Sequence, residues 1–285
     1  MENSSVGVSK SIGLFDSGVG GLTVLNEVRK CLPNENLVYL GDTARVPYGT
    51  KSVASISKYA EQAVRALESY DIKALVVACN TASAAALDVL RNSRPDLPII
   101  GVIDPGAQAA VSVSQKCHIG VIATESTISN QAYQKAILSI RPDASIKAAA
   151  CSLFVALAEE GWHEGELVEG IVKKSLESLF VHDPEQEGID TLVLGCTHFP
   201  SLRGAIQNVV GPKVRLVDSA TTAAEALCNA LDGLGLLNPT SRNGKVIFLV
   251  TDGPERFARV AKNFYSELIM PEDVTLIDIQ HFGFN

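Results

Sequence analysis

The stretch "ALVVACNTAS" (74–83) carries the pattern that decides the fold. A run of small and branched apolar residues ends at Cys79, and the polar residues Asn80 and Thr81 follow at once. A short apolar run that gives way to a helical pattern is typical of a buried parallel strand that turns into a helix. The stretch therefore predicts a strand that delivers a thiol to its carboxyl end, beside small polar side chains.

Similar apolar runs recur along the 285 residues, and helix-period segments such as 52–70, 166–181 and 219–234 separate most of them. Near-continuous Val, Ile and Leu strands that alternate with helices predict mainly parallel sheets covered on both faces. The predicted strands cover residues 11–15, 36–40, 73–78, 97–103, 118–123, 145–150, 191–195, 213–217, 245–250 and 274–279.

Two pairs of segments resemble each other, which suggests an internal repeat. They are "SIGLFDSGVGG" (11–21) with "HIGVIATESTI" (118–128), and "ALVVACNTASAAAL" (74–87) with "TLVLGCTHFPSLRGAI" (191–206). The first pair aligns Ile12 with Ile119, an offset of 119 − 12 = 107, and the second aligns Cys79 with Cys196, an offset of 196 − 79 = 117. Similar offsets in the same order predict two related α/β halves, although generic strand–helix units can resemble each other by chance.

The repeat also predicts where a ligand would bind. In open α/β sheets, ligands bind beyond the carboxyl ends of the strands. Two halves that face each other would place Cys79 and Cys196 on opposite walls of one cleft. We therefore expect an α/β protein of two similar domains, each a mainly parallel sheet flanked by helices, with the active site in the cleft between them.

Cys79 and Cys196 are the leading candidates for chemistry. Each is expected at a strand-to-helix junction, where the partial positive charge of the helix N-terminus lowers the pKa of a thiol. The alternative is a pair of inert core cysteines, since cysteine is among the most buried residue types. The other four cysteines lack this setting, and no C-x-x-C pair or metal-ligand spacing occurs, so we expect no metal site and no disulfide framework.

Polar residues near the predicted strand ends extend the candidate site. Asp16 and Ser17 open "DSGVGG" (16–21), where Asp16 could orient a thiol or simply cap a helix. This is not a dinucleotide-binding fingerprint, because Thr23 stands where the third glycine belongs. The segment "GDTARVPYGTKS" (41–52) is a polar loop that contains Pro47, Tyr48 and Gly49 and could equally be a plain surface connection.

Two further residues could assist a thiol. His198 follows Cys196 by two residues and could exchange protons with it, whereas an isolated histidine is more often structural. Glu159, in "LFVALAEEGW" (153–162), could act on such a pair, but the local pattern favours a helix-surface charge.

Composition excludes several classes of function. The formal net charge of −8 argues against direct nucleic-acid binding, which requires clustered Lys and Arg. No stretch approaches the ~18 consecutive apolar residues of a membrane span. Residues 1–10 show no signal-peptide pattern, and the unpaired cysteines suit a reducing compartment, so a cytoplasmic location is expected.

Five motifs together resemble the glutamate racemases. They are "GLFDSGVGGLTVL" (13–25), "GDTARVPYGTKS" (41–52), "VVACNTAS" (76–83), "GVIATESTI" (120–128) and "LVLGCTHFP" (192–200). They occur in the family's order and with similar spacing, and the resemblance covers residues 11–264. Ser152, Ala156 and Phe199 depart from the family's pattern but leave every candidate residue in place.

The resemblance implies a racemase that needs no cofactor and interconverts L- and D-glutamate. It implies a discontinuous first domain of residues 1–103 and 213–285, and an inserted second domain of residues 104–212. Cys79 and Cys196 would be the acid/base residues. Asp16 and His198 would be their proton partners, with Glu159 supporting His198. The substrate would contact Asp16, Ser17, Pro47, Tyr48, Gly49, Asn80, Thr81, Thr124, Thr127, Thr197 and His198.

The family also implies a setting for this activity. D-glutamate would enter peptidoglycan, and the protein would act as a cytoplasmic homodimer. Some glutamate racemases also inhibit DNA gyrase, so the resemblance implies gyrase as a possible partner. Nothing else in the sequence indicates this partner. A related enzyme for aspartate or a substituted malonate, and a small-molecule-binding protein with inert cysteines, are the competing hypotheses.

Two cysteines suit racemisation for a chemical reason. The reaction removes the α-proton from one face of the amino acid and returns a proton to the other. Two groups on opposite faces can do this without moving, because one thiolate abstracts while the opposite thiol donates. A thiol with a pKa of ~8.5 can be tuned towards ambient pH, and polar groups in a water-poor site would stabilise the charge that develops.

Overall fold

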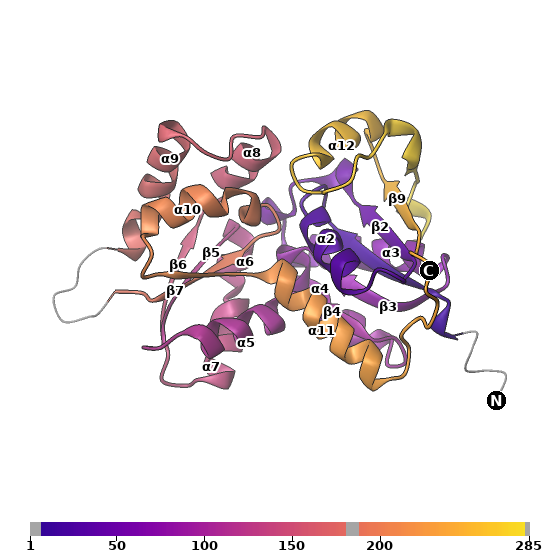
Figure 1. Ribbon diagram of the computed structural model, residues 1–285, viewed down its shortest axis with the longest axis horizontal. Coiled ribbons are helices and arrows are strands. Elements are labelled where there is room, and N and C mark those ends of the chain that lie inside the picture. The colour runs from indigo at the N-terminus through magenta and orange to yellow at the C-terminus, as the bar shows by residue number, and fades with distance from the viewer. Residues whose placement is uncertain (1–6, 181–187, 283–285) are drawn as a thin grey trace.

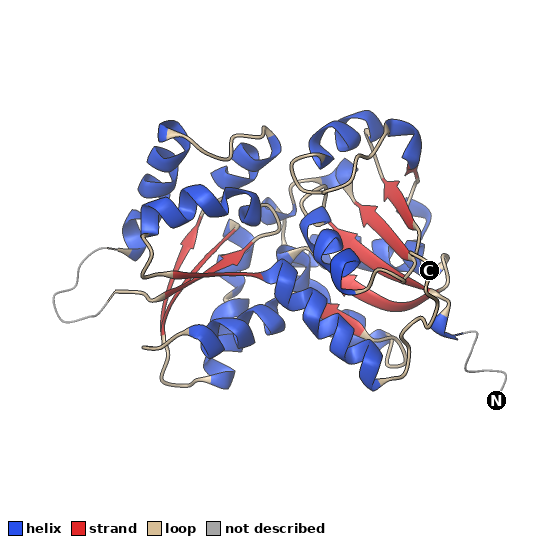
Figure 2. Ribbon diagram, in the orientation of Figure 1, coloured by secondary structure: helices blue, strands red, loops and turns tan. Residues whose placement is uncertain are grey.

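The computed structural model describes residues 7–180 and 188–282. It contains two separate sheets, seen side by side in Figures 1 and 2. The first has strand order β10-β9-β2-β1-β3-β4 and the second β6-β5-β7-β8, with all neighbouring strands parallel. The strands are β1 Ser11–Asp16, β2 Leu37–Gly41, β3 Ile72–Val77, β4 Ile99–Gly101, β5 His118–Ala123, β6 Ser145–Ala150, β7 Thr191–Gly195, β8 Arg215–Asp218, β9 Val246–Val250 and β10 Val274–Leu276.

Helices cover both sheets, which is why their central strands are mainly apolar, with Lys73 in β3 and Thr191 in β7 as polar exceptions. Every residue of β3 and of β7 is buried. A strand buried on both faces has no polar side to alternate with. The α-helices are α2 Leu22–Cys31, α3 Val53–Glu68, α4 Asn80–Ser93, α5 Ile103–Val113, α6 Glu125–Asn130, α7 Ala132–Ile140, α8 Leu153–Glu159, α9 Glu166–Leu176, α10 Arg203–Val210, α11 Ser219–Gly233 and α12 Pro254–Ala261.

The two sheets repeat one topology. The order β2-β1-β3-β4 in the first sheet matches β6-β5-β7-β8 in the second, strand for strand along the chain. Strands β1 and β5, and strands β3 and β7, are the pairs that the sequence repeat aligns. The predicted fold class is therefore confirmed, with β9 and β10 as an extension of the first sheet alone.

The helices that follow the fourth strand of each half are exchanged between the halves. Helix α5 follows β4 of the first sheet but packs on α7, β7 and β8 of the second half. Helix α11 follows β8 of the second sheet but packs on α2 of the first half, and also on α5. Figure 1 places α11 beside β4. Each half thus completes the packing of the other.

The predicted domain boundary and several predicted strand ends differ from the structure. Strand β8 pairs with β7, so the predicted division between residues 212 and 213 assigns a strand of the second sheet to the first domain. Strand β4 ends at Gly101 rather than at residue 103, because Ile103 already begins α5. Strand β10 ends at Leu276, three residues earlier than predicted. Within the described residues, no helix is long and apolar enough to cross a membrane.

Candidate active site

The two candidate thiols lie at the carboxyl ends of equivalent strands. Cys79 follows β3 and is the N-cap of α4, where its sulfur accepts a hydrogen bond from the Ala82 amide at 3.4 Å. Cys196 follows β7, but a 3₁₀ helix at Phe199–Leu202 separates it from α10, so the predicted direct junction with an α-helix is absent. The two residues are only 5% and 6% exposed. The charge of Cys196 contributes to raising the pKa of Cys79, so both sulfurs share one electrostatic environment.

Burial controls the protonation of Cys79. Desolvation, followed by the nearby charge of Asp16, raises the pKa of this thiol to about 12. Hydrogen bonds with Ala82 and with the Ser17 hydroxyl, 3.6 Å away, act in the opposite direction but are weaker. The helix N-terminus acts in the predicted direction through the Ala82 amide, but desolvation outweighs it, so the net shift of the Cys79 pKa is upward.

Asp16 is the last residue of β1 and is fully buried. Its Oδ2 accepts a hydrogen bond from the Gly18 amide at 2.9 Å. Its Oδ1 has no hydrogen-bond partner among the described residues, although the amides of Ser17 and Gly21 are near enough to lower its pKa. Desolvation dominates and raises the pKa of Asp16. This carboxyl group is thus poised to accept or share a proton close to Cys79.

A histidine and a glutamate accompany Cys196. Nδ1 of His198 lies 3.8 Å from the sulfur, and Nε2 lies 3.2 Å from Oε1 of Glu159. Burial lowers the pKa of His198, but the interactions with Cys196 and Glu159 outweigh it and raise the pKa to about 10. A protonated imidazole at this position places a positive charge beside the sulfur of Cys196. Glu159 therefore lies where the family resemblance places it, at the end of α8, and is not a free surface charge.

Three of the four threonines predicted to bind substrate form one buried cluster. The hydroxyl of Thr81, on α4, lies 3.0 Å from that of Thr124 and 3.2 Å from that of Thr127, and the last two are 3.1 Å apart. Thr81 comes from the first half, and Thr124 and Thr127 come from the junction of β5 and α6 in the second. Hydroxyl groups that hydrogen-bond each other can also turn towards a carboxylate.

A polar residue follows each thiol in the sequence, Asn80 after Cys79 and Thr197 after Cys196. The Asn80 side chain accepts a hydrogen bond from Tyr133 at 2.7 Å and donates one to Ser219 at 3.3 Å. The Thr197 hydroxyl lies 3.5 Å from Nδ1 of His198. Tyr133 and Ser219 were not identified from the sequence, because neither lies in a motif and the hydrogen bond from Tyr133 joins residues 53 positions apart.

The loop with Pro47, Tyr48 and Gly49 reaches the site by its backbone. The Tyr48 side chain is buried, packs against Phe15 and donates a hydrogen bond to Asp42. It therefore supports the loop from within the first half. At Gly49 the loop approaches the threonine cluster so closely that a Cβ would lie 2.8 Å from Cβ of Thr124. This residue must lack a side chain for the halves to meet.

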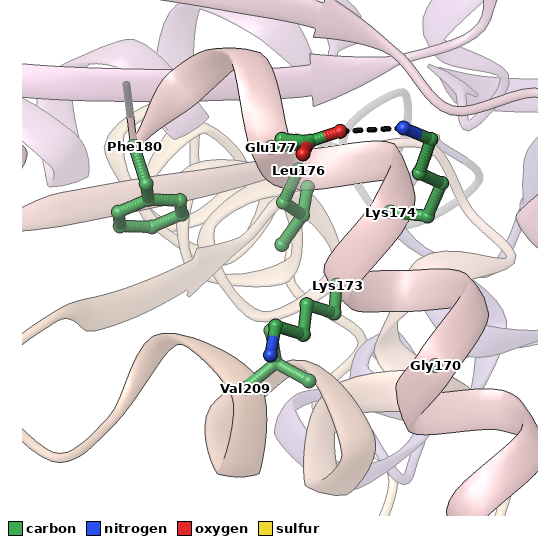
Figure 3. Close-up of a pocket in the computed structure, with 7 residues that line it drawn as sticks. All are labelled: Gly170, Lys173, Lys174, Leu176, Glu177, Phe180 and Val209. Atoms are coloured by element: carbon green, nitrogen blue, oxygen red, sulfur yellow. Dashed lines mark hydrogen bonds and ion pairs between the residues drawn. The ribbon is translucent and has the colours of Figure 1, made fainter. Parts of the chain in front are cut away.

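The cavities differ in how near they lie to these residues, and one of about 400 Å³ is lined by Gly49 and by residues of α6. One of about 470 Å³ lies beside α9 and α10 and is lined by residues such as Lys173, Phe180 and Val209 (Figure 3). None of the candidate residues lines it. Across residues 7–180 and 188–282, no group of three or more His, Cys, Asp or Glu side chains could hold a metal ion.

Comparisons with known proteins agree with this arrangement. The Asp/Glu/hydantoin racemase family model matches residues 22–227. A glutamate racemase of Geobacter metallireducens is 48% identical over 255 residues, 90% of this chain and 92% of that protein. The crystal structure of glutamate racemase isoform RacE1 from Bacillus anthracis has a TM-score of 0.88 and 38% identity, covering 94% of this chain and 97% of that one.

A second solved structure is similar over nearly the whole chain. The glutamate racemase of Francisella tularensis, determined in complex with D-glutamate, has a TM-score of 0.87 and 36% identity. The match covers 96% of this chain and 99% of that one. The chain therefore belongs to the Asp/Glu/hydantoin racemase family of isomerases and, within it, to the glutamate racemases.

Proposed function

We propose that this protein interconverts L- and D-glutamate without a cofactor, with Cys79 and Cys196 as the two acid/base groups. One observation carries the proposal. Equivalent strands of the two halves each lead into a buried thiol, and each thiol has its own titratable neighbour. Asp16 accompanies Cys79, and His198 accompanies Cys196.

The protonation states suit a transfer between opposite faces of the substrate. Cys79 retains its proton at neutral pH, because its pKa is raised to about 12. His198, whose pKa is raised to about 10, places a positive charge 3.8 Å from the sulfur of Cys196. In one direction Cys196 therefore takes the α-proton while Cys79 supplies a proton to the opposite face. The reverse direction begins with the products of this step, a thiol on Cys196 and a thiolate on Cys79.

The polar residues around the thiols suit a dicarboxylic amino acid. The hydroxyls of Thr81, Thr124 and Thr127 form one cluster, and Asn80 adds an amide beside it. Such groups bind carboxylates and can stabilise the negative charge that develops when the α-proton leaves. The Francisella tularensis relative was solved with D-glutamate, which supports glutamate as the substrate here rather than aspartate.

The first test follows the reaction in D₂O with purified protein and no added cofactor. With L-glutamate, we expect both the optical signal and the NMR signal of the α-proton to disappear. Loss of the proton with retention of optical activity would leave only one working base. If neither signal changed with L- or D-glutamate, the proposal would be wrong, and aspartate would be the next substrate to test.

Single-thiol variants test whether each cysteine acts on one face of the substrate. Cys79→Ser and Cys196→Ser each keep one thiol, so each should lose racemisation but exchange the α-proton of one enantiomer with solvent. We expect the two variants to exchange opposite enantiomers, because their remaining thiols face opposite sides of the substrate. Near-wild-type turnover in either variant would contradict the two-thiol mechanism.

We further propose that the product serves peptidoglycan synthesis in the cytoplasm and that the protein is a homodimer. Thiol catalysis needs a reducing compartment, and all six cysteines are free. Depletion of the protein should make growth depend on added D-glutamate, with shortened muropeptides in its absence.

Light scattering should give twice the 30.2 kDa mass of one chain. Unchanged gyrase supercoiling at micromolar protein would argue against the additional role as a gyrase inhibitor.

A further inference from the structure

The segment 254–264 of the first half contacts the acid/base pair of the second half. Arg256, on α12, donates a hydrogen bond from a terminal guanidinium nitrogen to Oε2 of Glu159 at 2.7 Å. Oε1 of the same carboxylate lies 3.2 Å from Nε2 of His198. The two carboxylate oxygens thus have different partners, and Arg256 is joined to Cys196 through Glu159 and His198.

Two further contacts come from the same segment. The Asn263 side chain donates to the backbone oxygens of Ala158 and Glu159, at 3.4 and 3.1 Å, where α8 ends. The ring of Phe264 stands edge-on to the imidazole of His198, with centroids 5.2 Å apart. Figure 1 shows α8 and α12 on the same side of the molecule, one from each half. The carboxylate, its backbone and the imidazole are each held by one residue of this segment.

The sequence of α12 explains why Arg256 lies there. Gly253, with φ of +57°, and Pro254 begin the helix, and Phe257 and Val260 are buried against the first sheet's core. That packing fixes the rotation of the helix and directs Arg256 across the interface. The family model ends at residue 227, so the whole segment lies outside the residues that it matches.

We propose that Arg256 is a positioning residue for the Cys196 half of the reaction. From the first half of the molecule, it keeps the Glu159 carboxylate within hydrogen-bonding distance of His198 in the second half. The inference rests on the proposed function and adds to it a residue that does not touch the substrate. When the halves are together, Arg256 fixes one carboxylate oxygen and leaves the other for His198. Without Arg256, Glu159 can turn towards solvent, since its side chain is 19% exposed.

The kinetic test uses the single-thiol variants. Arg256→Ala should slow α-proton exchange about 10- to 100-fold in the Cys79→Ser background, where only Cys196 exchanges, because small displacements of catalytic groups have effects of this size. It should leave exchange unchanged in the Cys196→Ser background. Arg256→Lys should restore most of the loss. Arg259→Ala is the matched control, because Arg259 is an exposed arginine of the same helix. Equal slowing of both thiols, or of neither, would overturn the proposal.

A second readout needs no turnover. The charged groups that face His198 are Cys196, Glu159 and Asp16, with Arg256 behind Glu159. The His198 ring signal can be followed by NMR against pH and identified by its loss in His198→Asn. Arg256→Ala should lower the titration midpoint by about one pH unit as Glu159 turns away, whereas Arg259→Ala should not. An unchanged or higher midpoint would overturn the positioning role. Absence of exchange in both single-thiol variants would instead count against the proposed function.

Discussion

The two thiols have different surroundings, although their strands are equivalent. Cys79 has a buried carboxyl group nearby, which works with desolvation to keep its proton in place. Cys196 has the imidazole of His198 within 3.8 Å, and the pKa of that imidazole is raised to about 10. The two equivalent thiols therefore have different titratable partners, a buried carboxyl group beside Cys79 and an imidazole beside Cys196.

His198 should make stability depend on pH. Its pKa is raised from 6.5 to about 10 in the folded protein, so between these values the folded state holds a proton that the unfolded state lacks. The stabilisation is complete below pH 6.5 and is lost as the pH rises through 10, by up to about 1.4 kcal/mol per pH unit. Urea unfolding from pH 6 to 10.5 should show this steeper decline in wild-type protein than in His198→Asn. Parallel curves would contradict it.

Gly20 sets the distance between the first half and His198. A Cβ at this position would lie 2.5 Å from two atoms of the imidazole ring and from Oγ1 of Thr197. Gly20→Ala should therefore displace His198 and lower turnover about 100-fold, with a loss of stability of about 1–3 kcal/mol. Gly204→Ala is the control, because its Cβ would have no neighbour within 4 Å. Wild-type turnover in Gly20→Ala would show that the ring can shift without consequence.

At the scale of elements, a buried ion pair fastens the amino-terminal end of the first sheet. Lys73, in β3, lies 2.6 Å from Glu35, and both side chains are 2% exposed. The lysine also donates to the backbone oxygens of Val8 and Leu236, and Glu35 accepts from the Asn238 amide. Three segments that are distant in sequence therefore meet at this pair: the one at Val8, the one at Glu35 and the one at 236–238.

Removing one partner of this pair should be costly. Lys73→Met would leave the Glu35 carboxylate buried without its cation, with a loss of about 3–5 kcal/mol in the free energy of unfolding. Lys73→Met combined with Glu35→Gln should recover part of it, since no charge is then stranded. Lys30→Met, which removes an exposed pair with Glu27, should cost less than about 1 kcal/mol. Urea unfolding measures all three, and equal effects of the two lysine substitutions would contradict the role of burial.

The ten strands could be predicted because each is a short apolar run between polar turns. The errors occur where one apolar run covers both the end of a strand and the start of a helix. "LPIIGVI" (97–103) reads as one strand, but the chain turns after Gly101 and Ile103 begins α5. Apolar periodicity over so few residues does not separate a strand end from a buried helix start. Which sheet β8 joins depends on its pairing with β7, and no local pattern encodes that choice.

The candidate site could be predicted where strand ends carry unusual residues, as at Cys79, Cys196 and Asp16. Arg256 could not be found in this way. It is an ordinary arginine on an amphipathic helix, and its partner lies 97 residues away in the other half. Tyr48 illustrates the opposite case, because its unusual presence in a polar loop is explained by burial and a hydrogen bond to Asp42.

At the scale of the whole molecule, the site is closed. Cys79 and Cys196 are almost fully buried, whereas Cys31 is exposed. A thiol reagent should label Cys31 first and reach the other two only when the halves separate. Glutamate should slow both. Mass spectrometry of timed samples measures the order, and labelling of Cys79 as fast as Cys31 would contradict a closed site.

The exchange of α5 and α11 has a thermodynamic consequence. Because each helix leaves one sheet and packs on the other half, neither half can melt and leave the second one intact. A protein of two sheets would otherwise be expected to show two heat-absorption peaks. Here, differential scanning calorimetry should give a single peak whose calorimetric and van't Hoff enthalpies agree. Two resolved peaks would mean that the exchanged helices pack too weakly to unite the halves into one cooperative unit.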